Sequence, residues 1–179
     1  MAAPDPKLRE IVSAEAVRAR IDEIGERLYR DYADTPAVFV VIAEGARRFA
    51  KALVDGLTAR NVHPDVIFLR AHRTVGSALG EVQVHGADPT VFEDRDVLIL
   101  DDIADEGRTL EAVSALVEEG EPRTQSVAVL VSKLSRRKVD IPLDYVGFEV
   151  DDGWVVGFGM DLDERYRDLD YLAVVDGVD

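Results

Sequence analysis

Three acidic side chains stand close together after an apolar run, and acids in this arrangement can bind a phosphorylated sugar. Val97–Leu100 is typical of a fully buried strand of a parallel sheet, and Asp101, Asp102 and Asp105 follow it. In open α/β sheets, ligands bind beyond the carboxyl ends of the strands, where helix N-termini offer free N–H groups to anions. Paired acids at such a strand end can hold ribose hydroxyls, either directly or through Mg²⁺.

A glycine-containing turn leads from these acids into a helical pattern. It reads Glu106, Gly107, Arg108 and Thr109, and a turn of this kind can accept a phosphate on its N–H groups. On their own, the acids would also fit a Walker-B-like strand or a phosphoryl-acceptor aspartate pair. The chain contains neither GxxxxGK[ST] nor GxGxxG, which excludes a P-loop NTPase and a dinucleotide-binding fold.

The elements that must position these residues alternate between strand and helix, which predicts an α/β fold with a mostly parallel sheet flanked by helices. Helices are expected over Ser13–Tyr32, from Gly45 to a break or cap at Gly56, and over Thr109–Glu119. Strands are expected over Ala37–Ile42, Val66–Leu69, Glu81–Val84, Val97–Leu100, Ser126–Val131, Tyr145–Val150 and Trp154–Gly157. The segment His72–Gly80 has no periodicity and is interpreted as a loop.

Composition limits the class of protein. With 179 residues, 47% of them hydrophobic, we expect one domain over residues 1–179. The absence of cysteine excludes disulfides, thiolate metal sites and a cysteine nucleophile. No apolar run approaches membrane-spanning length and the first residues do not resemble a signal peptide, so we expect a cytoplasmic protein without a membrane partner.

The net charge of −15 argues against a nucleic-acid partner. Only four of the 21 basic residues are lysine. Such an acid excess with few lysines is typical of a halophilic cytoplasm, and equally of an ordinary acidic protein from a GC-rich genome.

A family resemblance rests on four segments. The run Asp96–Leu110, DVLILDDIADEGRTL, resembles the phosphoribosyl-pyrophosphate signature of the type I phosphoribosyltransferases. The segments Leu143–Val150, Trp154–Leu169 and Tyr171–Val175 resemble those of hypoxanthine-guanine phosphoribosyltransferases. The resemblance covers the chain from roughly Ala37 to its end. With it we expect a small irregular hood built from both ends of the chain, and a homodimer or homotetramer.

The resemblance implies an enzyme of purine salvage with Mg²⁺ as cofactor. Its reaction transfers the 5-phosphoribosyl group of phosphoribosyl pyrophosphate to N9 of a 6-oxopurine, hypoxanthine first and guanine second, giving IMP or GMP and pyrophosphate. Asp101 and Asp102 would contact the ribose hydroxyls, directly or through metal, and Asp105 would handle the N7 proton of the purine. Backbone N–H groups from Asp105 to Thr109, with the Thr109 hydroxyl, would hold the 5-phosphate. Nearby carboxylates and a metal-bound leaving group suit an oxocarbenium-like transition state.

The same resemblance assigns the purine and pyrophosphate subsites. Lys133 would donate to the purine O6, Trp154 would stack on the base, and the Val155 backbone would read the base edge. The residues expected at pyrophosphate are Glu44, Gly45 and Arg167, with Asp161 helping to hold a second Mg²⁺. Arg136, Arg137 and Lys138 are interpreted as a solvated basic turn.

Three positions depart from the family pattern. In the early pyrophosphate loop, the family has Leu-Lys-Gly where this chain has Ala43, Glu44 and Gly45. In the phosphate loop, the family has Asp-Thr-Gly where this chain has Asp105, Glu106 and Gly107. The mobile loop of the family starts with Ser-Tyr, and the corresponding residues here are Ala71 and His72. A carboxylate beside a phosphate costs on the order of 1 kcal/mol at short range unless it points away. In one alternative, Glu106 faces solvent and Arg108 supplies a compensating charge. In the other, the chain has an altered phosphate affinity, uses a different phosphoribosyl donor, or has lost activity.

The other two departures also leave alternatives open. Arg47 and Arg48 could compensate Glu44 if the helix register presents them inward. His72 is either a replacement for tyrosine in a closing lid or a merely exposed loop residue.

Two rival functions remain. The first is a transferase of the same fold for xanthine or adenine; Lys133 favours a 6-oxo group over a 6-amino group, because it can only donate. The second is a catalytically weak, nucleotide-sensing regulatory protein, which Glu44 and Glu106 suggest.

Overall fold

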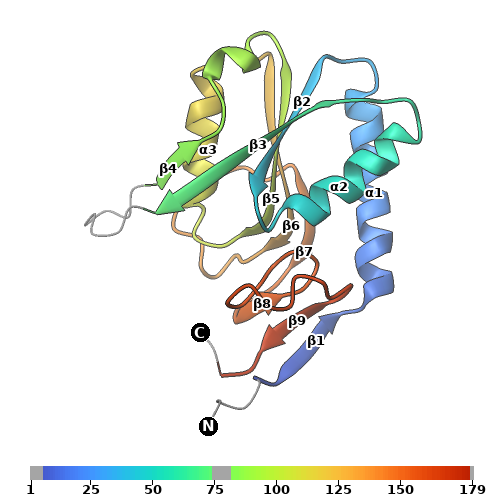
Figure 1. Cartoon of the computed structure of the whole chain (residues 1–179), viewed down its shortest axis with the longest axis vertical. Helices are drawn as coiled ribbons and strands as arrows, with labels where there is room; N and C mark the ends of the chain where they lie inside the picture. Colours follow the sequence, from blue (N-terminus) through green and yellow to red (C-terminus); the bar gives the residue numbers. More distant parts are fainter. Residues whose placement is uncertain (1–5, 74–81, 178–179) are drawn as a thin grey trace.

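In the described part of the chain, the β structure consists of two sheets, one of six strands and one of three (Figure 1). The computed structural model describes residues 6–73 and 82–177. The larger sheet has the order β4-β3-β2-β5-β6-β7, and among the described strands of this sheet only β4 runs antiparallel to its neighbour. Its strands are β2 (Ala37–Ala43), β3 (Asp65–Arg73), β4 (Val82–His85), β5 (Asp96–Ala104), β6 (Thr124–Ser132) and β7 (Tyr145–Glu149).

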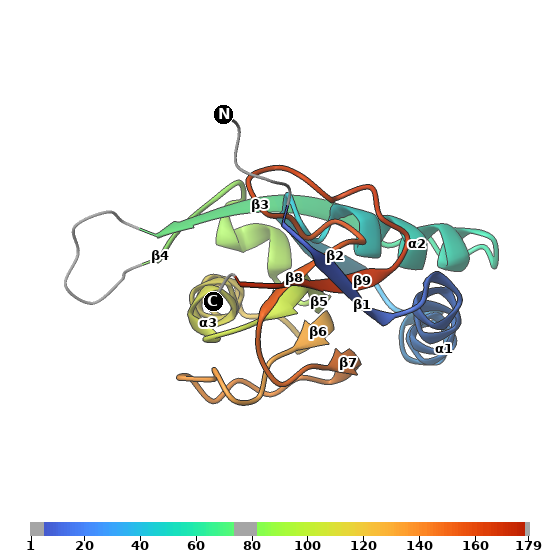
Figure 2. The ribbon, with the colours of Figure 1, turned by 90° about the horizontal axis from the view of Figure 1, so that it is seen from below.

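Helices cover both faces of the larger sheet, so the predicted α/β architecture is confirmed. They are α1 (Ala14–Tyr32), α2 (Arg47–Thr58) and α3 (Arg108–Glu118), with a short 3-10 turn, η1 (Pro89–Phe92). The pair α1 and α2 lies on one face and α3 on the other, as Figure 2 shows from below. Phe39 and Val41 of β2 pack with α1 and α2, whereas Val38 and Val40 pack with α3. This two-sided burial explains why the central strands are apolar throughout.

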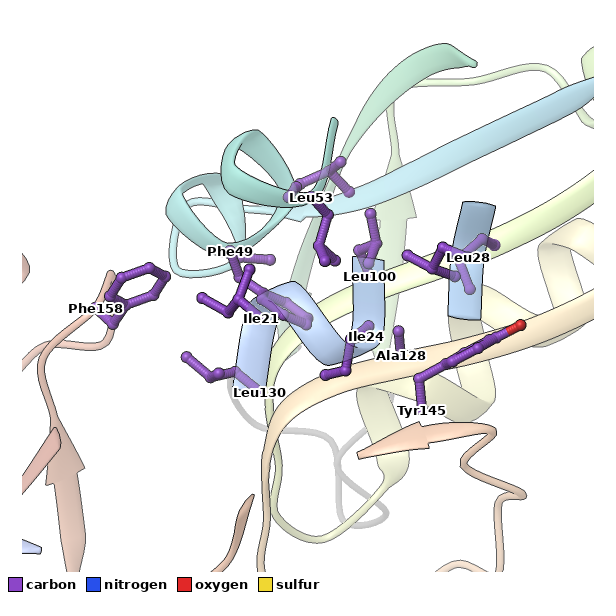
Figure 3. Close-up of a cluster of buried hydrophobic side chains, with 14 of the residues drawn as sticks. Ile21, Ile24, Leu28, Phe49, Leu53, Leu100, Ala128, Leu130, Tyr145 and Phe158 are labelled. Carbon is purple, nitrogen blue, oxygen red and sulfur yellow. The ribbon is translucent and has the colours of Figure 1, made fainter. Parts of the chain in front are cut away.

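The core on the α1–α2 side joins both helices to the sheet and to the C-terminal segment (Figure 3). Ser13 starts α1 by accepting a hydrogen bond from Ala16 N at 3.2 Å, which sets the register of its apolar face. The labelled side chains of this core are Ile21, Ile24, Leu28, Phe49, Leu53, Leu100, Ala128, Leu130, Tyr145 and Phe158. None of the helices in the described residues is long and apolar enough to cross a membrane.

The smaller sheet is the expected hood, and it is more regular than predicted. It consists of β1 (Leu8–Val12), β9 (Leu172–Val175) and β8 (Trp154–Val156), in that order and antiparallel. Figure 1 shows it below the carboxyl ends of the parallel strands, with β1 contributed by the N-terminal part and the other two by the C-terminal part. It therefore faces the edge where a ligand is expected.

Several boundaries differ from the prediction. Gly56 does not end α2, because Leu57 continues the buried face past it and a single glycine costs a helix only about 1 kcal/mol. β3 includes residues 72–73, which were predicted to lie in the loop His72–Gly80, and the rest of that predicted loop lies outside the described residues. The strand β5 runs on to Ala104, because Asp101 lies in register with Val129 of β6 and the pairing continues to the strand end. The first two acids are therefore strand residues.

Candidate active site

The two neighbouring acids near the end of β5 are Asp101, which is buried, and Asp102, which is partly buried. Asp101 is 6% exposed, and its Oδ1 accepts a hydrogen bond from Asp102 N at 2.9 Å. Asp102 Oδ1 accepts one from Ile103 N at 3.0 Å. Burial, and then the neighbouring Asp102 charge, raises the pKa of Asp101 well above its usual range; burial also raises the pKa of Asp102. Among the described residues, no basic side chain forms an ion pair with either carboxylate.

The loop after β2 packs directly on these acids. A Cβ at Gly45 would lie 1.8 Å from Asp102 Oδ2, so only glycine fits there without movement. A Cβ at Gly159 would lie 2.2 Å from Gly45 O. The Ala43–Glu44 peptide bond in this loop is cis. The backbone near Gly45, predicted to bind pyrophosphate, thus lies against the predicted ribose acids.

The turn between β5 and α3 forms one wall of a pocket of about 240 Å³. Gly107 has a φ of +90°, and a Cβ there would also lie 3.0 Å from Val139 O. Helix α3 starts immediately afterwards, so its unpaired N–H groups lie at the pocket. The lining consists of Ile42, Ala43, Gly45 and residues 101–110. The structure therefore brings together the predicted ribose and phosphate residues.

Glu106 is paired rather than solvated. Its side chain is 15% exposed, Lys138 Nζ lies 2.6 Å from its Oε1, and Arg108 Nε lies 3.4 Å from its Oε2. Of the alternatives that the sequence leaves open, a Glu106 side chain facing solvent does not match the structure, whereas Arg108 does lie beside its carboxylate. The structure adds Lys138, which comes from the segment after β6.

A second pocket, of about 210 Å³, adjoins the first at Asp102, Ile103 and Asp105. Its other lining residues are Lys133, Trp154, Val155, Met160 and Asp161. The three residues predicted to bind the purine thus lie in one pocket with the predicted acid/base.

Lys133 is the buried cation of this second pocket. It is 4% exposed, and its Nζ lies 3.9 Å from Asp105 Oδ2. Burial is the main cause of the lowered pKa of Lys133, which the Asp105 charge opposes. Trp154 Nε1 donates to Asp161 O at 2.8 Å, which fixes the orientation of a ring that is 40% exposed.

The basic segment after β6 forms a turn in which the Arg136 and Lys138 side chains are 38% and 58% exposed, but these side chains also contact acids of the site. Arg136 Nε lies 3.0 Å from Asp105 Oδ1, and its Nη1 lies 3.7 Å from an oxygen of Asp152. Arg137 donates to Ser132 Oγ at 3.0 Å. Sequence reasoning missed Arg136 and Asp152 as neighbours of the site, because these contacts form between loops and leave no periodic signal.

The pyrophosphate side is only partly as predicted. Arg167 Nη2 lies 2.8 Å from Asp161 Oδ1 and its Nη1 donates to Gly159 O at 2.7 Å, so these two residues, each predicted for this subsite, form an ion pair with one another. Arg48 does not point into the site: it donates to the backbone oxygens of residues 167 and 169. Arg47 pairs with Glu44 at 2.7 Å and lies over the Phe68 ring.

Glu44 and His72 contribute no side chain to the pockets. The residues on both sides of Glu44 line the first pocket, but Glu44 itself does not. His72 is exposed on β3 opposite Gln83 of β4. The proposed lid around it extends into residues 74–81, which lie outside the described residues.

The acidic strand end fits a divalent cation by its donors. Asp101 and Asp102 offer only oxygen ligands, which Mg²⁺ prefers; among the described residues neither carboxylate forms an ion pair, although the Arg167 charge opposes the effect of burial on the pKa of Asp102. In the described part of the chain, no three acidic or histidine side chains converge on one point. Mg²⁺ commonly binds through one or two carboxylates together with waters and substrate oxygens, so Asp101 and Asp102 suffice as protein ligands.

Comparison with known proteins agrees with this geometry. Residues 8–163 match the phosphoribosyl transferase domain family. The hypoxanthine-guanine phosphoribosyltransferase of Bacillus subtilis is 33% identical over 165 residues, covering 92% of this chain and 91% of the relative. The enzyme of the same name from Dictyostelium discoideum is 32% identical over 169 residues, covering 92% and 94%.

Solved structures give the same result. A hypoxanthine phosphoribosyltransferase from Staphylococcus aureus has a TM-score of 0.85 at 31% identity, covering 96% of this chain and 92% of its own. The enzyme from Trypanosoma cruzi in complex with its product IMP has a TM-score of 0.86 at 25% identity, covering 99% and 98%. The chain therefore belongs to the hypoxanthine-guanine phosphoribosyltransferases, within the phosphoribosyl transferase domain family.

Proposed function

We propose that this chain is a purine-salvage enzyme that moves the 5-phosphoribosyl group of phosphoribosyl pyrophosphate to N9 of a 6-oxopurine. Hypoxanthine is the first substrate and guanine the second, and the products are IMP or GMP and pyrophosphate. The observation that carries the proposal is the meeting of the two pockets at Asp102, Ile103 and Asp105. One pocket offers a helix N-terminus to a phosphate, and the other offers a buried ammonium and an aromatic ring to a base.

In the first pocket the donor would be held by its phosphate and its ribose. The N–H groups from Glu106 to Thr109 and the Thr109 hydroxyl would bind the 5-phosphate, with the α3 dipole adding attraction. The Asp101 and Asp102 carboxylates would accept hydrogen bonds from the ribose hydroxyls. A sugar held at both ends has its reacting carbon directed towards the second pocket.

In the second pocket the base would be selected by its oxygen. The Lys133 ammonium can only donate, so it would bind a purine O6 and reject a 6-amino group. Trp154 would stack on the ring and the Val155 backbone would read its edge. As the C1′–N9 bond forms and the bond to pyrophosphate breaks, Asp105 would take the N7 proton of the base.

We propose Mg²⁺ as the cofactor, with one ion held by Asp101 and Asp102 and a second held with the help of Asp161, each together with substrate oxygens. When bound, it would neutralise the charge that develops on the leaving pyrophosphate. Arg167, held by Asp161, and the backbone at Glu44 and Gly45 would bind the pyrophosphate itself.

We further propose a single-domain cytoplasmic protein that forms a homodimer, or a homotetramer built from it. The face between α2 and β3 supports this assembly, because Val66 and Phe68 are 36% and 44% exposed there. They line an apolar depression with Ala50 and Val54 of α2. Exposed apolar patches of this kind are typical of protein–protein contacts. Light scattering of Phe68→Asp against the wild type tests it: the variant should dissociate.

The test of the function is nucleotide formation monitored by absorbance. Hypoxanthine, guanine, xanthine and adenine would each be supplied with phosphoribosyl pyrophosphate and Mg²⁺, at low salt and in molar KCl. We expect IMP and GMP, and a loss of roughly 10²–10⁴-fold in kcat in Asp105→Asn with near-normal substrate binding. Faster reaction of xanthine or adenine would favour the rival transferase. No nucleotide from any base, with a folded protein, would contradict the enzyme and favour a nucleotide sensor.

A further inference from the structure

The acid that departs from the family pattern in the phosphate turn has a basic side chain on each oxygen. Lys138 Nζ contacts Glu106 Oε1 and Arg108 Nε contacts Oε2, at 2.6 and 3.4 Å. Lys138 reaches this acid from outside, since its side chain is 58% exposed and that of Glu106 is 15% exposed. The Glu106 carboxylate is thereby directed towards the segment that follows β6.

The backbone of this segment fixes Lys138 against the phosphate turn. Lys138 N and Val139 N both donate to Glu106 O, at 3.0 and 3.1 Å. Beside them, Val139 O approaches the Cα side of Gly107 so closely that a Cβ there would lie 3.0 Å from it. The two segments are 32 residues apart in the chain and are in contact at the first turn of the phosphate site.

We infer that Lys138 is a positioning residue of the phosphate subsite, which holds the Glu106 carboxylate away from the N–H groups that bind the 5-phosphate. The inference rests on the proposed function. A free carboxylate in this turn would repel the phosphate and could accept hydrogen bonds from the same N–H groups. With Lys138 in place, the turn keeps its affinity for an anion although an acid stands in it.

Four variants test this inference: Lys138→Met, Lys138→Arg, Glu106→Thr, and Glu106→Thr combined with Lys138→Met. The matched control is Lys7→Met, which removes the same charge from an exposed residue before β1. For each protein we would measure kcat and both KM values, and the binding of ribose 5-phosphate by calorimetry. Melting temperature would be recorded alongside, because a general structural defect would lower it.

We expect Lys138→Met to raise the KM for phosphoribosyl pyrophosphate and the Kd for ribose 5-phosphate roughly tenfold. The KM for hypoxanthine and kcat should change by less than about threefold, since neither pocket loses a contact to the base. Lys138→Arg and Lys7→Met should behave as the wild type. On the Glu106→Thr background, Lys138→Met should change the KM for the donor by less than about twofold, because no carboxylate remains to be held.

If the wild-type protein catalyses the reaction, three results with the variants would overturn the inference. The first is an unchanged donor KM in Lys138→Met. The second is an equal rise of both KM values with a lower melting temperature, which indicates a purely structural role. The third is a tenfold effect that persists on the Glu106→Thr background, which would mean that Lys138 contacts the phosphate itself. A wild type that neither turns over nor binds ribose 5-phosphate would instead overturn the proposed function, and the inference with it.

Discussion

The strand β5 has one buried aspartate at its start and another near its carboxyl end, and the two have opposite electrostatic surroundings. Asp96 is 5% exposed and Asp101 is 6% exposed. Arg123 donates to both oxygens of Asp96, through Nε at 2.9 Å and through Nη2, and Thr124 Oγ1 adds a bond at 2.8 Å. These contacts, Arg123 foremost, hold the pKa of Asp96 below its usual range. Burial and a neighbouring acid raise that of Asp101.

The difference separates an acid that stabilises the fold from one that we propose to bind a ligand. Asp96 and its partners join the start of β5 to the start of β6, and the protein itself supplies the basic partner. Near the other end of the same strand, Asp101 lines a pocket, and among the described residues no basic side chain forms an ion pair with it. A buried charge without a partner is costly, and such costs are typical of binding sites.

The largest expected contrast is in activity. Asp101→Asn should lower kcat/KM roughly 10²–10³-fold, because an amide accepts hydrogen bonds from the ribose more weakly and carries no charge for the transition state. Asp96→Asn, at the far end of the strand, should change it by less than about threefold. Steady-state kinetics with hypoxanthine measures both values. Losses of kcat/KM of similar size in the two variants would contradict the different roles of Asp96 and Asp101.

Stability should show the reverse order. Asp96→Asn leaves Arg123 without its partner and should lower the free energy of unfolding by about 2 kcal/mol. Asp101→Asn removes an uncompensated buried charge and should raise it by about 1 kcal/mol at neutral pH. Urea denaturation measures both values. A destabilised Asp101→Asn would mean that this acid, too, serves the fold.

The two acids should also give pH dependences of opposite sign. In the folded protein the pKa of Asp96 lies below its ordinary value of 3.8. This difference stabilises the fold fully above pH 3.8, and the stabilisation is lost as the pH falls through the pKa that Asp96 has in the folded protein. In the folded protein the pKa of Asp101 lies above its ordinary value of 3.8. This difference stabilises the fold fully below pH 3.8, and the stabilisation is lost as the pH rises through the pKa that Asp101 has in the folded protein.

Unfolding free energies between pH 3 and 8, in metal-free buffer, test this. Asp101→Asn should lose less stability than the wild type as the pH rises above 3.8, and Asp96→Asn should lose less as the pH falls below it. Parallel curves for all three proteins would contradict the assignment.

The smallest expected effect comes from the hydroxyl beside Asp96. Thr124→Val keeps the shape of the side chain but removes the 2.8 Å hydrogen bond, and should cost about 1 kcal/mol of unfolding free energy. Its kcat/KM should equal that of the wild type. A change in activity without one in stability would connect this end of the strand to the site after all.

Much of the fold could be predicted from the sequence, because the pattern of buried residues is local. The apolar run of β5 and the helical spacing of Val17, Ile21, Ile24 and Leu28 in α1 both match the structure. The strands β1 and β9 were not predicted. They have five and four residues, and they become a sheet only where the two ends of the chain meet.

The site shows the same limit. The acids after Val97–Leu100 and the glycine turn could be recognised, since they are contiguous in the chain. The contacts of Arg136 with Asp105 and of Lys138 with Glu106 could not, because a basic segment has the same composition whether it faces solvent or another loop. Only the pairing of β5 with β6 brings these segments together.

Calorimetric titration of phosphoribosyl pyrophosphate with Mg²⁺ into the wild type, Asp96→Asn and Asp101→Asn tests the central claim most directly. The account predicts that the wild type and Asp96→Asn bind the donor with equal affinity, whereas binding to Asp101→Asn is at least roughly tenfold weaker. Equal binding by all three proteins, or no binding by the wild type, would contradict the claim that the carboxyl end of β5 is held open for this ligand.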